Sequence, residues 1–356
     1  MAQLLVVGEY QPGDSSIANG LVQAINGDYA IAGRVFLPNG NSMATAIRTD
    51  LSANIIWQRI YSAPFTTFFT AIDQVADGDF VATGSYFYSP FSGDEYIWVV
   101  KLNRDGDKVL EEAFGSKEEQ SDGEDVTATS DGGFAVTGLF REKLSDRTGT
   151  RVLKFGRDNS LEWDQRFDTG VAYAIRQTRD GGYILSGARQ IPDSLNSNPY
   201  VLRLDAKGNK LWEQVYTDYQ VYVLLNSGVA ETQTGNFVLA LKSLLMEIDC
   251  CGKVIWARQS DALNMGTVAL LPRQTPVFGG SLIVNNFDHA FVVALDEQGE
   301  NILWSNTEIS FPSGINQIIL NRAGFITATG YLPINITNSQ MFLAVYDSAQ
   351  TIVPLK

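Results

Sequence analysis

Short runs of alternating apolar and polar residues recur along the whole chain, separated by turns rich in Gly, Asp and Asn. Alternation with a period of two is typical of half-buried β-strands. No stretch shows the 3.6-residue period of an amphipathic helix, which a parallel βαβ crossover would need. The pattern therefore predicts an all-β protein in which consecutive strands pair antiparallel.

The turns repeat as well as the strands. An Asp-Gly or Asn-Gly step, which tolerates positive φ and is typical of tight hairpins, joins two strands in each unit. Its clearest copies lie at residues 26–33, 77–84, 131–138 and 180–187, with weaker copies at 234–237, 275–280 and 323–326. A second turn phrase follows later in each unit, for example from Asp205 to Trp212. Two hairpins per unit predict four strands, named a to d in chain order.

Seven such units predict a seven-bladed β-propeller of four-stranded antiparallel blades. The seventh unit, which includes Asp347, has only a short, Pro-interrupted strand d at 351–354, whereas Leu4 to Val7 form a spare strand before the first unit. We expect this N-terminal strand to complete or double the outer edge of blade 7 and close the ring. The alternative is an open solenoid, which would normally carry capping repeats. The expected single domain spans 1–356, with blades at about 18–61, 68–114, 123–167, 171–216, 223–260, 266–305 and 313–356 plus 1–9.

Two segments carry a family resemblance: Thr178–Tyr183, with the pattern Thr-x-Asp-Gly-Gly-Tyr, and Leu204–Trp212, with Leu-Asp-x-x-Gly-Asn-x-x-Trp. The pattern resembles the repeats of bacterial and archaeal propeller proteins, which are often surface-associated and mostly uncharacterised. The second segment also loosely resembles the tryptophan docking motif of quinoprotein-type propellers. It lacks the Thr before the turn Gly, and those enzymes typically carry eight blades. The resemblance implies an architecture and says little about function, because propellers have many unrelated roles.

Composition narrows the possible partners. The 356 residues include 26 Lys and Arg against 40 Asp and Glu, a net charge of −14, which gives no general attraction to nucleic acid or an anionic membrane. No apolar run approaches the ~20 residues of a membrane span. The first ten residues contain no Lys or Arg and so lack the basic start of a signal peptide. We expect an intracellular protein, or a mature exported one that lacks its signal.

Few residues can support catalysis or metal binding. The chain has one histidine, His289, and two adjacent cysteines, Cys250 and Cys251. A disulfide framework, a Cys/His zinc site and a His-based triad therefore all lack residues they need. We expect His289 at the surface in the loop between strands b and c of blade 6. The cysteines should be reduced thiols in a turn, with a redox pair as the alternative. No catalytic or cofactor-binding residue is predicted.

The loops that vary between units carry the candidate binding surface. In a propeller the b–c and d–a loops emerge on one face, and rigid scaffolds place function on such loops. Blade 2 and the loop before it are rich in aromatic residues, which interface cores favour. We expect a partner-binding patch formed by Phe65, Phe68, Tyr86, Phe87, Tyr88 and Phe91. Tyr96 and Trp98 should enter strand c instead. The alternative is that the rings pack on one another as a private small core.

An acidic cluster formed by Asp122, Glu124 and Asp125 is expected at the mouth of the central channel. Asp125 occupies a strand-a position that is small in most other units. Oxygen ligands suit Ca²⁺, so a calcium site is one interpretation and a solvated acidic loop is the other.

We expect a non-enzymatic, protein-binding or scaffolding propeller that uses the b–c/d–a face. The alternative is a carbohydrate-binding or carbohydrate-active propeller, because paired carboxyl groups are the machinery of glycoside hydrolysis. The recurrent tryptophans point to neither function. They occupy one structural position in successive units and are expected to pack between blades; they are Trp57, Trp163, Trp212, Trp256 and Trp304.

Overall fold

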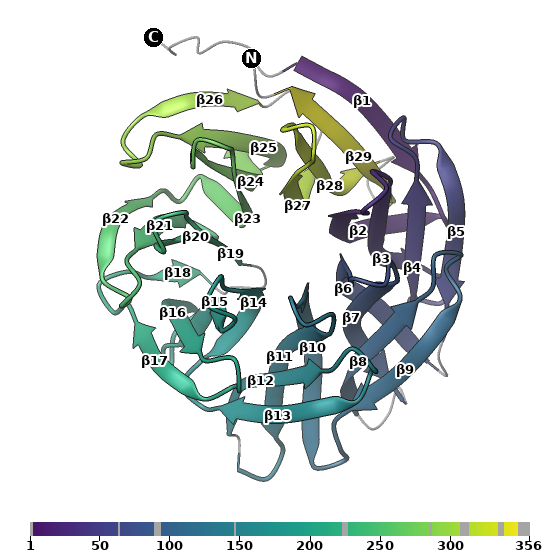
Figure 1. The fold of residues 1–356 in the computed structure, drawn as a ribbon, viewed down its shortest axis with the longest axis horizontal. Helices are drawn as coiled ribbons and strands as arrows, with labels where there is room; N and C mark the ends of the chain where they lie inside the picture. Colours follow the sequence, from purple (N-terminus) through teal and green to yellow (C-terminus); the bar gives the residue numbers. More distant parts are fainter. Residues whose placement is uncertain are drawn as a thin grey trace.

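A computed structural model describes residues 3–62, 65–88, 94–145, 147–222, 227–284, 287–306, 313–333 and 338–347. Within these ranges the strands form seven sheets arranged around a central axis, with antiparallel pairing between neighbours (Figure 1). The predicted seven-bladed β-propeller is therefore confirmed. No helix in the described ranges is long and apolar enough to cross a membrane.

Each blade runs from an inner strand a to an outer strand d. Blade 1 contains β2 (Ser15–Gln23), β3 (Tyr29–Phe36), β4 (Ser42–Thr49) and β5 (Ile55–Tyr61); blade 2 contains β6 (Thr66–Gln74), β7 (Phe80–Phe87), β8 (Glu95–Leu102) and β9 (Lys108–Phe114). Blade 3 contains β10 (Glu119–Ala128), β11 (Phe134–Glu142), β12 (Thr148–Phe155) and β13 (Leu161–Phe167). Blade 4 contains β14 (Val171–Gln177), β15 (Tyr183–Gln190), β16 (Asn196–Leu204) and β17 (Lys210–Val215), and the short β18 (Val221–Tyr222) also pairs with β16.

The last three blades follow the same order. Blade 5 contains β19 (Gly228–Glu231), β20 (Phe237–Leu241), β21 (Leu244–Ile248) and β22 (Val254–Gln259); blade 6 contains β23 (Leu263–Leu270), β24 (Pro276–Val284), β25 (Phe287–Leu295) and β26 (Ile302–Asn306). Blade 7 contains β27 (Gly314–Leu320), β28 (Ile326–Pro333) and β29 (Ser339–Asp347), with β1 (Gln3–Tyr10) as its fourth strand.

The N-terminal strand closes the ring, as predicted. β1 pairs antiparallel with β29, with Tyr10 opposite Met341, and lies at the outer edge of blade 7 (Figure 1). The Tyr10 hydroxyl donates a 2.9 Å hydrogen bond to the carbonyl of Ala53 in the c–d turn of blade 1. Tyr61 and Tyr216, which end or follow strand d of their own blades, make the same kind of bond to the next blade. β1 therefore fills the place of a strand d. The predicted strand at 351–354 lies outside the described residues.

Four of the five recurrent tryptophans pack between blades against a glycine, and the turn that would face Trp304 lies outside the described residues. A Cβ on the turn glycine of the following blade would lie 2.5–3.2 Å from the nearest atom of the preceding blade's indole ring. These pairs are Trp57 with Gly106, Trp163 with Gly208, Trp212 with Gly252, and Trp256 with Gly299. Blade 2 has Leu110 in place of the tryptophan, and the matching turn of blade 3 carries Asn159 (φ 67°) in place of the glycine. A tryptophan in one blade therefore occurs together with a turn glycine in the next blade, and where the tryptophan is missing the glycine is missing too.

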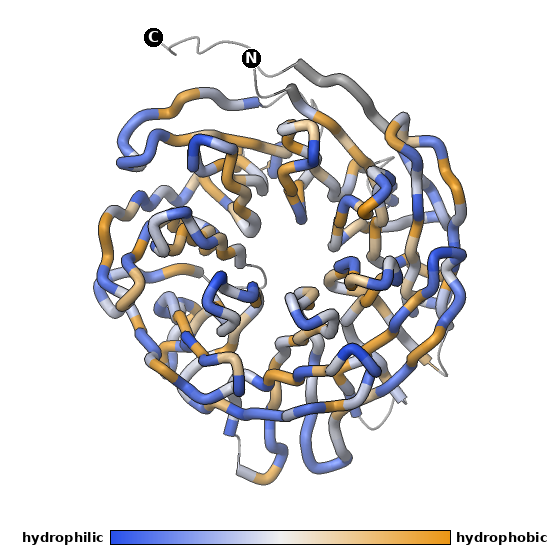
Figure 2. The backbone as a smooth tube through the Cα atoms, viewed as in Figure 1, coloured by the Kyte–Doolittle hydropathy of each residue, from blue (hydrophilic) through white to orange (hydrophobic). Residues whose placement is uncertain are grey.

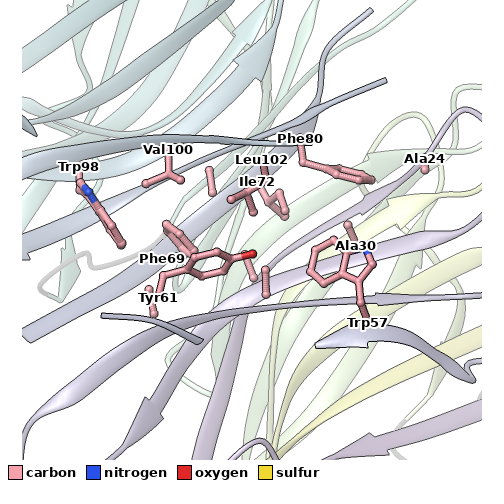
Figure 3. Packing of buried hydrophobic residues seen from close by; sticks show 14 residues of the cluster. Ala24, Ala30, Trp57, Tyr61, Phe69, Ile72, Phe80, Trp98, Val100 and Leu102 are labelled. Atoms are coloured by element: carbon pink, nitrogen blue, oxygen red, sulfur yellow. The ribbon is translucent and has the colours of Figure 1, made fainter. Parts of the chain in front are cut away.

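Hydrophobic residues lie mainly along the strands, and many of the turns are hydrophilic (Figure 2). Buried apolar residues of neighbouring blades form common clusters, for example between blades 1 and 2. Between blades 1 and 2 the ring of Phe69 stacks on Trp98, with centroids 5.0 Å apart, and contacts Tyr61 at 5.6 Å (Figure 3). Trp98 is fully buried, so its assignment to packing is correct.

Several candidate residues lie in strands where we expected loops. Phe68 belongs to β6, Tyr86 and Phe87 to β7, and His289 to β25. Aromatic residues fit the pleated surface of a sheet, and here they extend the strands beyond the boundaries we predicted. The acidic cluster is also part of a strand, β10, and not a solvated loop.

The Trp–Gly contact gives a stability prediction. Gly208→Ala and Gly235→Ala both place a side chain at positive φ, +79° and +86°, which costs roughly 1–2 kcal/mol. Only Gly208 has a neighbour within 4 Å of the new Cβ, the Trp163 ring at 3.0 Å. We expect Gly208→Ala to lower the thermal unfolding midpoint more than Gly235→Ala does. Overpacking against the ring should cost an extra ~1–2 kcal/mol of unfolding free energy. Equal losses in the two variants would contradict the interblade contact.

Candidate functional site

An axial cavity of about 540 Å³ is lined by the inner strands of all seven blades. Its wall includes candidates from the sequence, namely Phe68, Asp122, Glu124 and Asp125. It also includes Arg34 of β3, at a charged position in an otherwise apolar strand. The cavity therefore lies on the axis, where residues from different blades converge.

A β-bulge in each of six inner strands directs one residue to this cavity. The register of strands a and b shifts at Asn19, Thr70, Glu124, Tyr173, Gly266 and Asn316. Every one of these residues lines the cavity. A bulge leaves its extra residue outside the ladder and re-aims its side chain, so the bulges set the chemistry of the axis. In blade 5 the residues before Ser227 lie outside the described ranges.

Three bulge side chains link neighbouring blades. Asn316 donates to the carbonyl of Ala18 at 2.8 Å, and Asn19 donates to the carbonyl of Phe69 at 2.7 Å. Thr70 donates to the carbonyl of Gly123 at 2.8 Å. Each acceptor directly precedes the next blade's bulge residue. Glu124 occupies the next place in this series, and an ionised carboxylate has no proton to donate there.

Asp125 is an interblade link. Its Oδ2 accepts hydrogen bonds from the backbone N–H of Ile175 at 2.9 Å and from Arg176 at 2.5 Å. Thr267 in blade 6 accepts from the N–H of Ile318 in the same way, at 3.1 Å. Burial raises the pKa of Asp125, and Arg176 acts in the opposite direction. Its carboxylate is therefore engaged within the wall of the cavity.

Asp122, Glu124 and Glu95 form a group of mutually repelling carboxyls. Asp122 accepts from the Ser85 hydroxyl, and Glu95 accepts from Gln120 at 2.7 Å. Burial, together with the charge of Glu95, raises the pKa of Asp122 to about 7. The pKa of Glu124 is raised well above its usual range by burial and then by Asp122, Glu95 and Asp125. The protonated form of Glu124 is therefore favoured more than it is for an exposed glutamate.

Within the described residues, no group of three or more His, Cys, Asp or Glu side chains could hold a metal ion. The carboxyls of β10 project from a single strand and are held by Ser85 and by Arg176. The Ca²⁺ site considered from the sequence has no ligand set in the described part of the chain.

The aromatic candidates are partly assembled. Phe68 and Phe87 lie with ring centroids 6.3 Å apart, and Tyr86 lies 6.3 Å from both Tyr96 and Trp98. Phe65, Phe68, Tyr86 and Phe87 are half-buried, whereas Tyr88 is 62% exposed. Phe91 lies outside the described residues. From here on, "aromatic patch" means Phe65, Phe68, Phe87 and Tyr88.

The remaining reactive side chains lie apart from this cavity. His289 is half-buried in β25, opposite Leu282. Cys250 and Cys251 are exposed free thiols with sulfur atoms 3.7 Å apart in the c–d turn of blade 5. The carbonyl of Cys250 accepts a 3.1 Å hydrogen bond from the Trp212 indole, which gives this turn a structural part in blade packing.

Comparison with known proteins identifies the fold. No protein-family model and no curated protein matches the sequence. The chain is similar to the WD40 β-propeller domain of Doa1, with a TM-score of 0.61, 10% identity and coverage of 98% of each chain. It is also similar to a protein of unknown function from Dyadobacter fermentans, with a TM-score of 0.56, 13% identity, and coverage of 97% of this chain and 99% of that one.

A third similar structure is Sqt1 of Chaetomium thermophilum bound to the N-terminus of the ribosomal protein L10. Its TM-score is 0.55 at 12% identity, and the match covers 90% of this chain and 84% of that one. These likenesses establish the propeller fold. The resemblance to quinoprotein-type propellers stays a prediction.

The sequence analysis named Glu124 but missed the other bulge residues and Arg34. One signal in the sequence could have revealed the bulge residues. In three units a polar residue, Asn19, Thr70 or Glu124, directly precedes the aligned strand-a position, which is Gly20, Ala71 or Asp125. Arg34 stands out only as the charged residue in the run from Tyr29 to Phe36.

Because the pKa of Asp122 is raised, we expect the stability of the folded protein to decrease as the pH rises. The folded state keeps the Asp122 proton up to about pH 7, whereas an unfolded Asp releases it near 3.9. The folded state therefore binds more protons between these values, and this contribution to stability is lost as the pH rises from about 4 to 7. We expect Asp122→Asn to raise the melting temperature above wild type at pH 8. The free energy of unfolding should rise by on the order of 2 kcal/mol at that pH, and by less at pH 4.

Asp131→Asn is the control, with the opposite sign. The Lys154 ammonium lies 2.8 Å from Asp131, whose pKa is lowered to about 2. This substitution should lower the melting temperature at pH 8 and have progressively less effect as the pH falls below about 4. An Asp122→Asn variant that is less stable than wild type at pH 8 would contradict the assignment.

Proposed function

We propose that this protein is a non-enzymatic, protein-binding or scaffolding propeller whose partner docks on the b–c/d–a face over blades 1 and 2. The supporting observation is the aromatic patch. Tyr88 is 62% exposed and adjoins Phe87, whose ring lies 6.3 Å from Phe68. An exposed aromatic side chain beside half-buried rings at the end of a strand gives a large contact area at low entropic cost, and aromatic residues are enriched among those that dominate binding energy at interfaces.

The similar structures support the same class of function at the level of the fold. The similar domain of Doa1 is a WD40 β-propeller, and Sqt1 is bound in its structure to the N-terminus of the ribosomal protein L10. Propellers serve many functions, so the argument for this chain depends on its own surface.

A carbohydrate-active propeller is the second candidate, favoured by one observation. Asp122 and Glu124 line the axial cavity with raised pKa values, and a carboxyl group that keeps its proton near neutral pH is what a general acid requires. Asp125 is less suited, because Arg176 and the Ile175 amide engage it. Hydrolysis of nitrophenyl glycosides that disappears in Glu124→Gln would favour this candidate.

Site-specific photo-crosslinking tests the protein-binding proposal. We would replace Tyr88 by p-benzoylphenylalanine in the full chain, and Leu51, which is 57% exposed in the c–d turn of blade 1, in a control. We expect discrete higher-mass adducts from position 88 in extracts of the native organism and none from position 51. Mass spectrometry identifies the partner, and the adduct should form again with the purified partner.

Matched variants separate an interface from a private core. Phe87→Ser should abolish the adduct from position 88 with little change in melting temperature, because Phe87 is only half-buried. Leu144→Ser, at a 93% exposed position in the b–c loop of blade 3, should leave the adduct intact. A large fall in the melting temperature of Phe87→Ser, or equal crosslinking from both faces, counts against the proposal.

A further inference from the structure

An arginine without an acidic partner lies beside the aromatic patch. The Arg34 Cζ is 4.9 Å from the ring centroid of Phe36 and 5.3 Å from that of Phe68. The side chain is half-buried and lines the axial cavity. Its buried Nε has no hydrogen-bond partner, and none of the described carboxylates forms an ion pair with it. Its neighbours are therefore aromatic rings.

Three other arginines are paired with carboxylates; Arg151 and Arg203 are buried, and Arg48, whose Nε also lacks a partner, is half-buried. Arg48 contacts Asp28 at 2.8 Å, Arg151 contacts Asp164 at 2.8 Å, and Arg203 contacts Asp180 at 2.6 Å. With 40 acidic residues against 26 basic ones, the missing partner of Arg34 does not reflect a shortage of carboxylates. Burial lowers the pKa of Arg34, with no opposing acidic group. Even partial burial of a charge without a counter-charge costs free energy, so the retention of Arg34 points to a counter-charge from outside this chain.

We propose that Arg34 is a carboxylate-binding residue, and that its ligand is an Asp or Glu side chain of the protein partner inserted into the mouth of the axial cavity. This inference rests on the proposed protein-binding function and names the chemistry that the partner must present.

The geometry favours a carboxylate. A guanidinium that lies over aromatic rings can still offer its Nη N–H groups to a ligand, and this planar edge matches a carboxylate in a bidentate pair. A phosphate group would bring a charge of about −1.5 to −2 into a cavity whose wall already holds Asp122, Glu124 and Asp125. A singly charged carboxylate meets less repulsion there.

The surface is continuous with the proposed interface. Arg34 lies over Phe68, the Phe68 ring is 6.3 Å from Phe87, and Phe87 precedes the exposed Tyr88. One extended segment can therefore place an acidic side chain at Arg34 and an apolar one on the aromatic patch. Arg next to aromatic residues is the composition of binding hot spots.

The test is an NMR titration of the arginine Nε–Hε resonances at low ionic strength, with N-acetyl-glutamate amide as the probe. Arg34→Met identifies the Arg34 resonance by its loss. We expect this resonance to shift with the glutamate probe and not with N-acetyl-glutamine amide. The response should persist in Arg59→Met, which removes an arginine from β5. A shift with inorganic phosphate alone, or no shift with any probe, overturns the proposal.

Stability provides an independent check. Because Arg34 has no acidic partner to lose, Arg34→Met should keep the wild-type melting temperature or raise it. Arg203→Met leaves Asp180 without its partner and should lower the melting temperature by several degrees. Equal destabilisation by both substitutions would make Arg34 a structural residue and overturn the proposal. Crosslinking from position 88 without any carboxylate response at Arg34 would also overturn it, and would leave the protein-binding function standing.

Discussion

The crowding of inner strands around the axis is the constraint on which the rest of the molecule depends. A Cβ on Gly20 would lie 2.8 Å from the backbone nitrogen of Ile72, and one on Gly228 would lie 2.8 Å from the Cα of Thr267. At the equivalent position Asp125 and Thr267 keep their side chains by accepting an N–H of the next blade. In blades 1 to 6 the residue at this strand-a position is therefore small or bonds to the neighbouring backbone, whereas blade 7 has Gln317 there. At this position the backbones of neighbouring inner strands approach closely, which allows seven blades to fit around the axis.

The same crowding determines what the axis presents. The extra residue at each bulge lines the axis and, except at Gly266, supplies an axial side chain. Asn316, Asn19 and Thr70 use theirs to bind the next blade, whereas Glu124 and Tyr173 introduce acidity and a phenol on one side of the ring. Substitution at Glu124, which makes no such bond within the described residues, can therefore change the chemistry of the axis without breaking an interblade link of this kind.

The sequence predicted the fold well because each unit repeats its own turn chemistry. The turn glycines, the recurrent tryptophans and the spare N-terminal strand each identified a contact that the structure contains. The site was harder to predict. Glu124 and Asp125 are adjacent in sequence, yet the bulge makes one an axial side chain and the other an interblade link, and residue order alone does not reveal a change of register. The aromatic residues of blade 2 favour strand structure as much as exposure, so Tyr86 could not be separated from Tyr88 in advance.

The isolation of Arg34 could not be foreseen at all, because it depends on what other blades place around it. Arg34 lies over Phe68, Phe68 pairs with Ser85 across β6 and β7, and the Ser85 hydroxyl donates to Asp122. Blade 2 thus stands between an unpaired cation and a group of carboxyls that raise one another's pKa. The Arg34 guanidinium and these carboxyl groups, which could pair in contact, are held apart on one cavity wall. Neither Arg34 nor the carboxyl groups take part in the tryptophan–glycine contacts or in the apolar layers between blades. The packing of the propeller therefore accommodates both. A local conflict of this kind, within a fold that is consistent elsewhere, is expected where a surface is shaped for a ligand.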